Sequence, residues 1–218
     1  MSTLRQRLTA VQQGDHLCLF YEKPAERLAT VIEYFRIGLA RNEQCLYVCS
    51  EETCEDFLET LRRAGLLTPE LELRGAVRIL DKTRAYLKGR KFIAERMVQM
   101  LNEAVEKALD AGFIGLRAAG DMTWILDAAP GTDTAITYEA LMNQFYPTAR
   151  ALGLCLYDRK RMAAETLDGA IRTHPRALVE GHICANPFFE PPDVFFNRVH
   201  PRENTERKLR QIAALRAS

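Results

Sequence analysis

Short apolar runs alternate along the chain with longer stretches in which apolar residues recur every three or four positions. The short runs are rich in leucine, valine and cysteine, which is typical of the buried strands of a parallel sheet. They cover residues 16–21, 44–49, 76–81, 113–119, 153–157 and 177–180. The longer stretches have helical periodicity and cover residues 24–41, 52–65, 90–111 and 134–152. This alternation predicts an α/β fold of three layers, in which helices cover both faces of a mostly parallel sheet.

Glycine and proline mark the expected ends of these helices. Gly65, Gly112 and Gly153 follow helical stretches, at positions where a C-cap belongs. Pro147 lies inside the stretch 134–152 and is expected to kink or shorten that helix, because proline lacks the amide hydrogen that a helix needs.

The C-terminal part of the chain has a different pattern. Residues 182–202 contain four prolines and four phenylalanines, which predicts an ordered but irregular segment pinned to the body by its aromatic rings. Residues 203–216 predict a short basic amphipathic helix with Leu209 and Ile212 on its apolar face. We therefore expect a domain over residues 1–192 and an extension over residues 193–218.

Composition sets few limits on function. The 218 residues suit one large domain, and a net charge of +1 gives no overall attraction to nucleic acid or membrane. The absence of a signal-peptide pattern or a long apolar run predicts a cytoplasmic protein. Without a CxxC pair, the six cysteines are expected to pack in the core, although the spacing of Cys45, Cys49 and Cys54 leaves a thiol sensor open.

The first strand–helix junction lacks a phosphate-binding loop. In parallel α/β sheets ligands bind beyond the carboxyl ends of the strands, and a phosphate-binding loop at such a strand end is rich in glycine. The stretch GDHLCLFYEKPAERL (residues 14–28), which contains the first strand and the start of the next helix, has no glycine after Gly14. The chain contains no Gly-Lys dipeptide, and the closest match to P-loop spacing, residues 115–122, places Asp121 where the lysine is needed. No nucleotide or other cofactor is therefore expected.

Several stretches together indicate a known family. They are GDHLCLFYEKPAERL (14–28), EYFRIGLARNEQCLYVCSEET (33–53), LRAAGDMTW (116–124), YEALMNQF (138–145), LCLYDRKRM (154–162), THPRALVEG (173–181) and NPFF (186–189). In order and spacing, the chain over residues 12–192 resembles the MEDS sensory domain, the methanogen/methylotroph DcmR-type module. More broadly, it resembles a KaiC/RecA-type ATPase core whose P-loop has been replaced. The resemblance implies a RecA-like sheet and the sensing of a small organic molecule in prokaryotic signalling.

The expected ligand site gathers aromatic and charged residues at the carboxyl edge of the sheet. Trp124 offers an aromatic wall for a small apolar ligand. Arg117 lies in an apolar run and needs either an ion-pair partner (Asp121, Glu51 or Asp158) or an anionic ligand. The full set is Tyr21, Glu22, Glu51, Lys82, Arg84, Arg117, Asp121, Trp124, Tyr157 and Arg159. His16 opens the first strand, at the opposite end from this edge, and His174 precedes a proline in a turn, so a structural role is favoured for both.

Three functions remain open. The first is a non-catalytic small-molecule sensor, since the chain has no Ser-His-Asp order, HExxH motif or dinucleotide fingerprint. The second is a divergent KaiC-like ATPase that binds a nucleotide with Mg²⁺. In that case Glu51 or Glu52 activates water, and Lys23 or the pair Lys82 and Arg84 replaces the missing lysine. The third is an interaction module for a histidine kinase, a regulator or a second copy of the chain. No metal site, nucleic-acid partner or membrane partner is expected.

Overall fold

The fold is built around one mixed sheet. The structure, a computed structural model, describes residues 3–49, 54–85, 92–127, 132–199 and 201–214. The described strands form a seven-stranded sheet in the order β3-β2-β4-β5-β1-β6-β7, parallel throughout except for the antiparallel pair β6 and β7. The strands are β1 (His16–Tyr21), β2 (Gln44–Cys49), β3 (Val77–Asp81), β4 (Leu116–Asp121), β5 (Ala151–Asp158), β6 (Arg176–Val179) and β7 (His182–Ala185).

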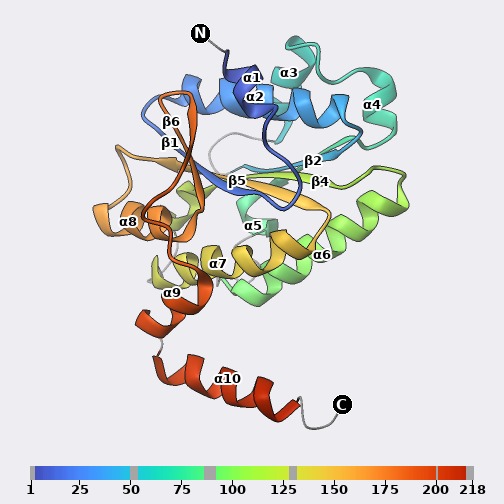
Figure 1. The fold of residues 1–218 in the computed structure, drawn as a ribbon. Helices are drawn as coiled ribbons and strands as arrows, with labels where there is room; N and C mark the ends of the chain where they lie inside the picture. The colour runs from blue at the N-terminus through green and yellow to red at the C-terminus, as the bar shows by residue number, and fades with distance from the viewer. Residues whose placement is uncertain (1–2, 50–53, 86–91, 128–131, 200, 215–218) are drawn as a thin grey trace.

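Helices cover both faces of this sheet, which confirms the predicted three-layer α/β class and is consistent with a RecA-like arrangement (Figure 1). On one face lie α1 (Leu4–Leu8), α2 (Pro24–Ala40), α3 (Cys54–Arg63) and α4 (Pro69–Leu73). On the other lie α6 (Ala94–Asp110), α7 (Thr132–Phe145) and α8 (Ala164–Thr173). The short elements α5 (Lys82–Ala85), η1 (Met122–Asp127) and η2 (Tyr146–Thr148) connect strands and helices, and α9 (Pro192–Val199) and α10 (Pro201–Ala214) end the described chain.

The central strands are buried on both sides, so alternate residues enter two separate cores. In β1, Leu17, Leu19 and Tyr21 pack toward α2, whereas Cys18 packs toward α7. All the residues of β2 and β5 are buried, which explains why these strands are almost continuously apolar. Side chains on the α7 face can therefore build a site that is closed off from solvent.

The sequence predicts the bounds of β1, β2 and α2 to within one residue, but it places the fourth strand too early in the chain. The predicted strand 113–119 is β4 at Leu116–Asp121. Phe113 instead closes helix α6, because its amide donates to the carbonyl of Ala108 and Gly112 adopts the left-handed conformation with φ of 82°.

Two predictions around α7 have opposite outcomes. The helix ends at Phe145 and passes into the short 3-10 turn η2, so the expected shortening at Pro147 is confirmed. Gly153 is not a helix C-cap, however, but an interior residue of β5, where the ring of Tyr146 packs directly over it. A side chain at Gly153 would occupy the same space as that ring.

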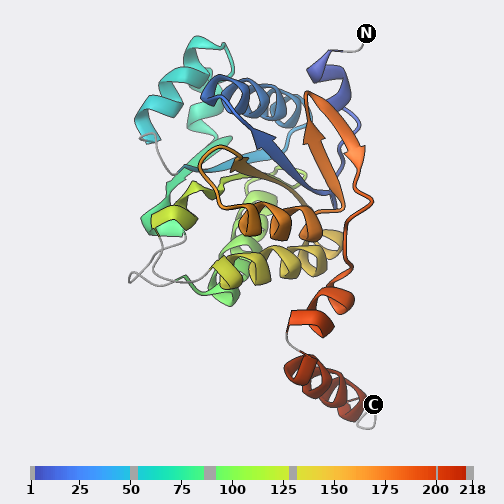
Figure 2. The same cartoon turned by 90° about the vertical axis from the view of Figure 1, so that its left-hand side faces the viewer.

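The C-terminal part is more regular than its proline content suggests, because residues 182–202 contain β7 and α9. Phe195 and Phe196 of α9 pack on Ile136 and Ala140 of α7. Helix α10 then extends away from the sheet and its flanking layers (Figure 2). Within the described residues, no helix is both long and apolar enough to cross a lipid bilayer.

Candidate functional site

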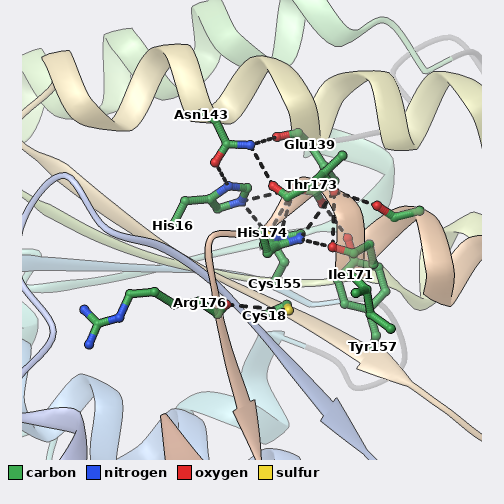
Figure 3. A network of polar contacts seen from close by, with 12 residues as sticks. His16, Cys18, Glu139, Asn143, Cys155, Tyr157, Ile171, Thr173, His174 and Arg176 are labelled. Carbon is green, nitrogen blue, oxygen red and sulfur yellow. Dashed lines mark hydrogen bonds and ion pairs between the residues drawn. The ribbon is translucent and has the colours of Figure 1, made fainter. Parts of the chain in front are cut away.

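Four buried side chains with metal-binding or acid–base chemistry meet between the sheet and helix α7. They are His16 at the start of β1, Glu139 in α7, Cys155 in β5 and His174 directly after α8, and we call them the buried cluster (Figure 3). Each is at most 7% exposed. Three separate elements and the residue after a fourth supply these side chains, so the cluster exists only in the folded chain.

Glu139 lies at the centre of the cluster. Its Oε2 atom lies 3.2 Å from His16 Nε2, 3.4 Å from His174 Nε2 and 3.4 Å from Cys155 Sγ. Cys155 Sγ is also 3.6 Å from His16 Nε2. The other carboxylate oxygen of Glu139, Oε1, accepts a hydrogen bond of 2.8 Å from the hydroxyl of Tyr157. One carboxylate oxygen therefore faces two imidazole nitrogens and a thiol at close range.

The orientation of His16 is held by Asn143, one turn after Glu139 in α7. The amide nitrogen of Asn143 donates to the carbonyl oxygens of Thr173, at 2.6 Å, and Glu139, at 3.2 Å. Its amide oxygen must then be the atom that lies 3.0 Å from His16 Nδ1. Since that oxygen only accepts, Nδ1 of His16 carries the hydrogen, and Nε2 of the neutral ring has a free lone pair.

His174 has the same arrangement. Its Nδ1 atom lies 2.7 Å from the carbonyl oxygen of Ala170 and therefore donates to it. Nε2 of the neutral ring is again left with a lone pair, and this buried atom has no hydrogen-bond partner among the described residues. Both histidines thus direct their Nε2 atoms at Glu139.

Burial shapes the acid–base properties of the cluster. Desolvation, reinforced by the nearby His174, lowers the pKa of His16 and favours its neutral form. Burial and then the charge of Glu139 raise the pKa values of the Cys155 thiol and the Tyr157 hydroxyl well above their usual ranges. Desolvation also acts against the charge on Glu139, but the adjacent imidazoles outweigh it and hold the pKa of that carboxyl below its usual range. The carboxylate charge of Glu139 is thus buried against the two imidazoles.

Imidazole nitrogen, thiolate sulfur and carboxylate oxygen are all common ligands of transition metals, and here one donor atom from each of the four residues lies within 4.8 Å of the others. The cluster can also pass a proton between histidine, glutamate and thiol. Both capacities come from residues on the face of the sheet rather than at its carboxyl edge.

A small cavity adjoins the cluster. It has a volume of about 20 Å³, room for about one water molecule, and lies between the sheet and helices α6 and α7. Its walls include Leu46, Met97, Leu101 and Ala118, and Cys155 belongs to both the cavity and the buried cluster. The cavity therefore joins an apolar space to the polar donors.

A second polar group lies at the carboxyl edge of the sheet, on the α2 face. Asp121, at the end of β4, is fully buried and forms an ion pair with Arg27 of α2. Asp121 also accepts hydrogen bonds from the amide of Thr123, at 3.0 Å, and from its hydroxyl, at 2.7 Å. Arg27 donates to the hydroxyl of Tyr47 and lies 6.0 Å from the ring centre of Tyr21. Two residues of the predicted site, Tyr21 and Asp121, are brought together here.

Other residues of the predicted site lie apart from this group. Glu22 and Arg159 form a partly exposed ion pair at 3.4 Å. Trp124 is buried in η1 and packs against the tilted ring of Phe92, with ring centres 4.6 Å apart. Tyr157 points to the α7 face, where it joins Glu139.

The remaining residues of that set follow the third strand or lie near its neighbours. Lys82 is half-buried at the start of α5. Glu51, the alternative base Glu52 and the side chain of Arg84 lie outside the described residues.

Arg117 is paired, but with a different partner from those expected. Its Nε donates to Glu43 at 2.6 Å, and its guanidinium lies 4.5 Å from the ring centre of Tyr34. Asp121 was an expected partner, but four residues along an extended strand span about 13 Å, which is too far for an ion pair. Pairing with Asp121 is therefore wrong, and Arg117 belongs to the amino-terminal half of β4.

The sequence does not single out the buried cluster, because each member has an ordinary alternative explanation. His16 stands at the strand end opposite the expected site, Cys155 fits an apolar strand, and His174 fits a turn. The useful signal is Glu139 together with Asn143, two polar residues one turn apart on a helix. Predicting that face requires knowing that Tyr138 and Met142 of the same helix pack on the sheet.

Comparison with known proteins agrees with the resemblance seen in the sequence. The chain is 24% identical over 164 residues to the transcriptional repressor DcmR of Methylorubrum extorquens (strain DSM 6343 / CIP 106787 / DM4). The matched region covers 73% of this chain and 58% of the repressor, so the chain spans less than two thirds of that relative. Residues 15–175, which contain all four members of the buried cluster, match the family model of the methanogen/methylotroph DcmR sensory domain. The chain therefore belongs to the MEDS family of sensory domains.

Proposed function

We propose that this chain is a non-catalytic module that senses a small organic molecule in prokaryotic signal transduction or transcriptional regulation. Membership of a sensory family and the likeness to a transcriptional repressor support a sensory or regulatory role. The observation that carries the proposal is the cavity between the sheet and α7, which has apolar walls and reaches the buried cluster at Cys155. Binding sites for small molecules commonly combine an apolar space with a few fixed polar groups.

The size of the cavity links binding to movement. At about 20 Å³ it holds roughly one water molecule, so a larger ligand needs more room, which a shift of α6 or α7 away from the sheet would supply. Helix α7 also carries Ile136 and Ala140, on which Phe195 and Phe196 of α9 pack. A ligand that binds better to the shifted arrangement changes the position of α9, and with it the start of α10. In this proposal α9 and α10 transmit the signal to a protein partner such as a kinase or regulator.

The test is a thermal-shift screen of small organic molecules, with Mg²⁺ and ATP as a separate arm. We expect an organic compound to raise the unfolding midpoint, and the variant Ala118→Val to lose that shift because the added methyl groups fill the cavity. The matched control Ala64→Val makes the same change on the opposite side of the sheet and should keep the shift. Strong magnesium-dependent stabilisation by ATP with turnover, or full ligand binding by Ala118→Val, would contradict the proposal.

A further inference from the structure

We propose that His16, Glu139, Cys155 and His174 bind a divalent transition metal ion, with Zn²⁺ as the best match to their donor atoms. The proposal concerns the buried cluster alone and does not depend on which organic molecule the domain senses. Two imidazoles, one carboxylate and one thiolate supply the nitrogen, oxygen and sulfur ligands that Zn²⁺ takes in tetrahedral sites.

The spacing of the donor atoms fits a tetrahedral site. Zn²⁺ bonds to nitrogen, oxygen and sulfur are about 2.0–2.3 Å long, which places neighbouring ligands about 3.3–3.8 Å apart. The distances from Glu139 Oε2 to the two imidazole nitrogens and the sulfur are 3.2, 3.4 and 3.4 Å. The distance from Cys155 Sγ to His16 Nε2 is 3.6 Å. Four of the six distances between ligand atoms are thus close to the required separations before an ion is added, and all four atoms lie within 4.8 Å of one another.

The outer hydrogen bonds prepare both histidines for a metal. A metal-bound histidine normally donates its other ring N–H to a carbonyl or carboxylate oxygen, which orients the ring. Here Nδ1 of His16 donates to the amide oxygen of Asn143, and Nδ1 of His174 donates to the carbonyl of Ala170. Both Nε2 atoms are left with lone pairs, and that of His174 has no hydrogen-bond partner among the described residues. In the neutral rings, both lone pairs point toward Oε2 of Glu139, and that of His16 also lies 3.6 Å from the sulfur of Cys155.

Charge balance also favours a divalent cation. Binding requires Cys155 to release its thiol proton to solvent as the sulfur–metal bond forms. The thiolate and the Glu139 carboxylate then carry two negative charges, which the divalent ion neutralises, while the two imidazoles stay neutral. The Tyr157 hydroxyl continues to donate to the other oxygen of Glu139. The site as a whole is neutral, which suits a region with almost no solvent exposure.

The direct test uses the intact purified chain, stripped with a chelator and then dialysed against Zn²⁺ or Co²⁺. We expect about one tightly held metal ion per chain by elemental analysis. With Co²⁺ we expect the absorption of a tetrahedral site, together with a thiolate-to-cobalt charge-transfer band. A wild-type protein that retains no metal, or shows no thiolate band with Co²⁺, would overturn the proposal without any variant.

Two pairs of variants assign the ligands. Cys155→Ser should lose the charge-transfer band, whereas Cys184→Ser, at an exposed cysteine of β7, should keep it. His174→Ala should bind Zn²⁺ at least about 10-fold more weakly, whereas His182→Ala, at an exposed histidine, should bind as the wild type does. If the control variants lose as much metal as the cluster variants, the ion lies elsewhere. Loss of organic-ligand binding with metal binding intact would instead count against the sensing proposal only.

Discussion

At the residue scale, the feature outside the buried cluster that is most costly to bury is the charge of an arginine inside the sheet. Arg117 is fully buried in β4 and pairs with Glu43, which is itself almost completely buried. Two of its guanidinium nitrogens have no hydrogen-bond partner among the described residues and lie near the ring of Tyr34 instead. Gly38 of α2 leaves the space for this side chain, since a Cβ there would lie 2.6 Å from Arg117 Cδ. The positive charge of Arg117 is therefore balanced inside the sheet by the carboxylate of Glu43.

Removing one partner of this pair should be costly. Glu43→Ala leaves the guanidinium of Arg117 buried without a counter-charge, and we expect the free energy of unfolding to fall by about 3–5 kcal/mol. Urea denaturation followed by circular dichroism measures the loss. The control is Glu59→Ala, which removes exposed ion pairs with Arg62 and Arg63 and should cost less than about 1 kcal/mol. Equal losses of unfolding free energy in the two variants would show that the buried ion pair stabilises the fold no more than the exposed ion pairs do.

At the element scale, the turn that follows α7 packs closely against strand β5 on the α7 face of the sheet. The ring of Tyr146 in η2 packs over Gly153 of β5 and lies 5.1 Å, centre to centre, from the ring of His16. A glycine in the middle of a strand often marks such a close approach. The same contact supports one side of the buried cluster.

The substitution Gly153→Ala tests this contact. The new Cβ would lie 2.2 Å from the Tyr146 hydroxyl, so the ring must move, and we expect a loss of about 1–3 kcal/mol in the free energy of unfolding. In a Tyr146→Ala background the same substitution should cost much less, because the clash is gone. Urea denaturation of the two single variants and the double variant gives this coupling. If Gly153→Ala lowers the free energy of unfolding equally in both backgrounds, the loss does not come from a clash with Tyr146.

The strands and the central helices can be predicted from hydrophobic period, whereas their exact contacts cannot. β1 and β2 have continuous apolar runs with clear ends, and Pro147 stops α7 for a local reason that the sequence states. Gly153 follows a helical pattern, so a C-cap is the natural local interpretation. Its true role depends on Tyr146, which only the tertiary fold brings over β5.

The candidate site shows the same limit. The carboxyl-edge rule for parallel sheets leads to Tyr21 and Asp121, which do meet near Arg27. The buried cluster lies instead on a face of the sheet, where strand pairing sets Cys18 beside Cys155 and His16 beside Gly153. Glu139 reaches this face from a helix that is distant in sequence from β1. The spacing of these residues in the sequence does not show that they are close in space. Their proximity can be predicted only when the order of the strands in the sheet is known.

At the scale of the whole molecule, the described chain separates into a layered body and an outlying helix. Helix α9 is anchored on α7 through Phe195 and Phe196, both nearly buried. In α10, by contrast, Leu209 and Ile212 are more than half exposed, and both views of the fold show the helix pointing away from the sheet (Figures 1 and 2). The boundary in stability is therefore expected between α9 and α10, a few residues beyond the predicted domain end at residue 192.

Two truncations locate this boundary. Removing residues 201–218 takes away Leu209 and Ile212, which are mostly exposed, so we expect the free energy of unfolding to change by less than about 1 kcal/mol. Removing residues 192–218 also strips Phe195 and Phe196 from α7, and the loss of a packed phenylalanine costs about 3–5 kcal/mol. The longer truncation should therefore unfold at clearly lower urea, whereas the shorter one should keep the midpoint and the metal content of the full chain. If both truncations shift the midpoint equally, α10 stabilises the body and cannot act as a free output helix, because its position would then be tied to the sheet layers.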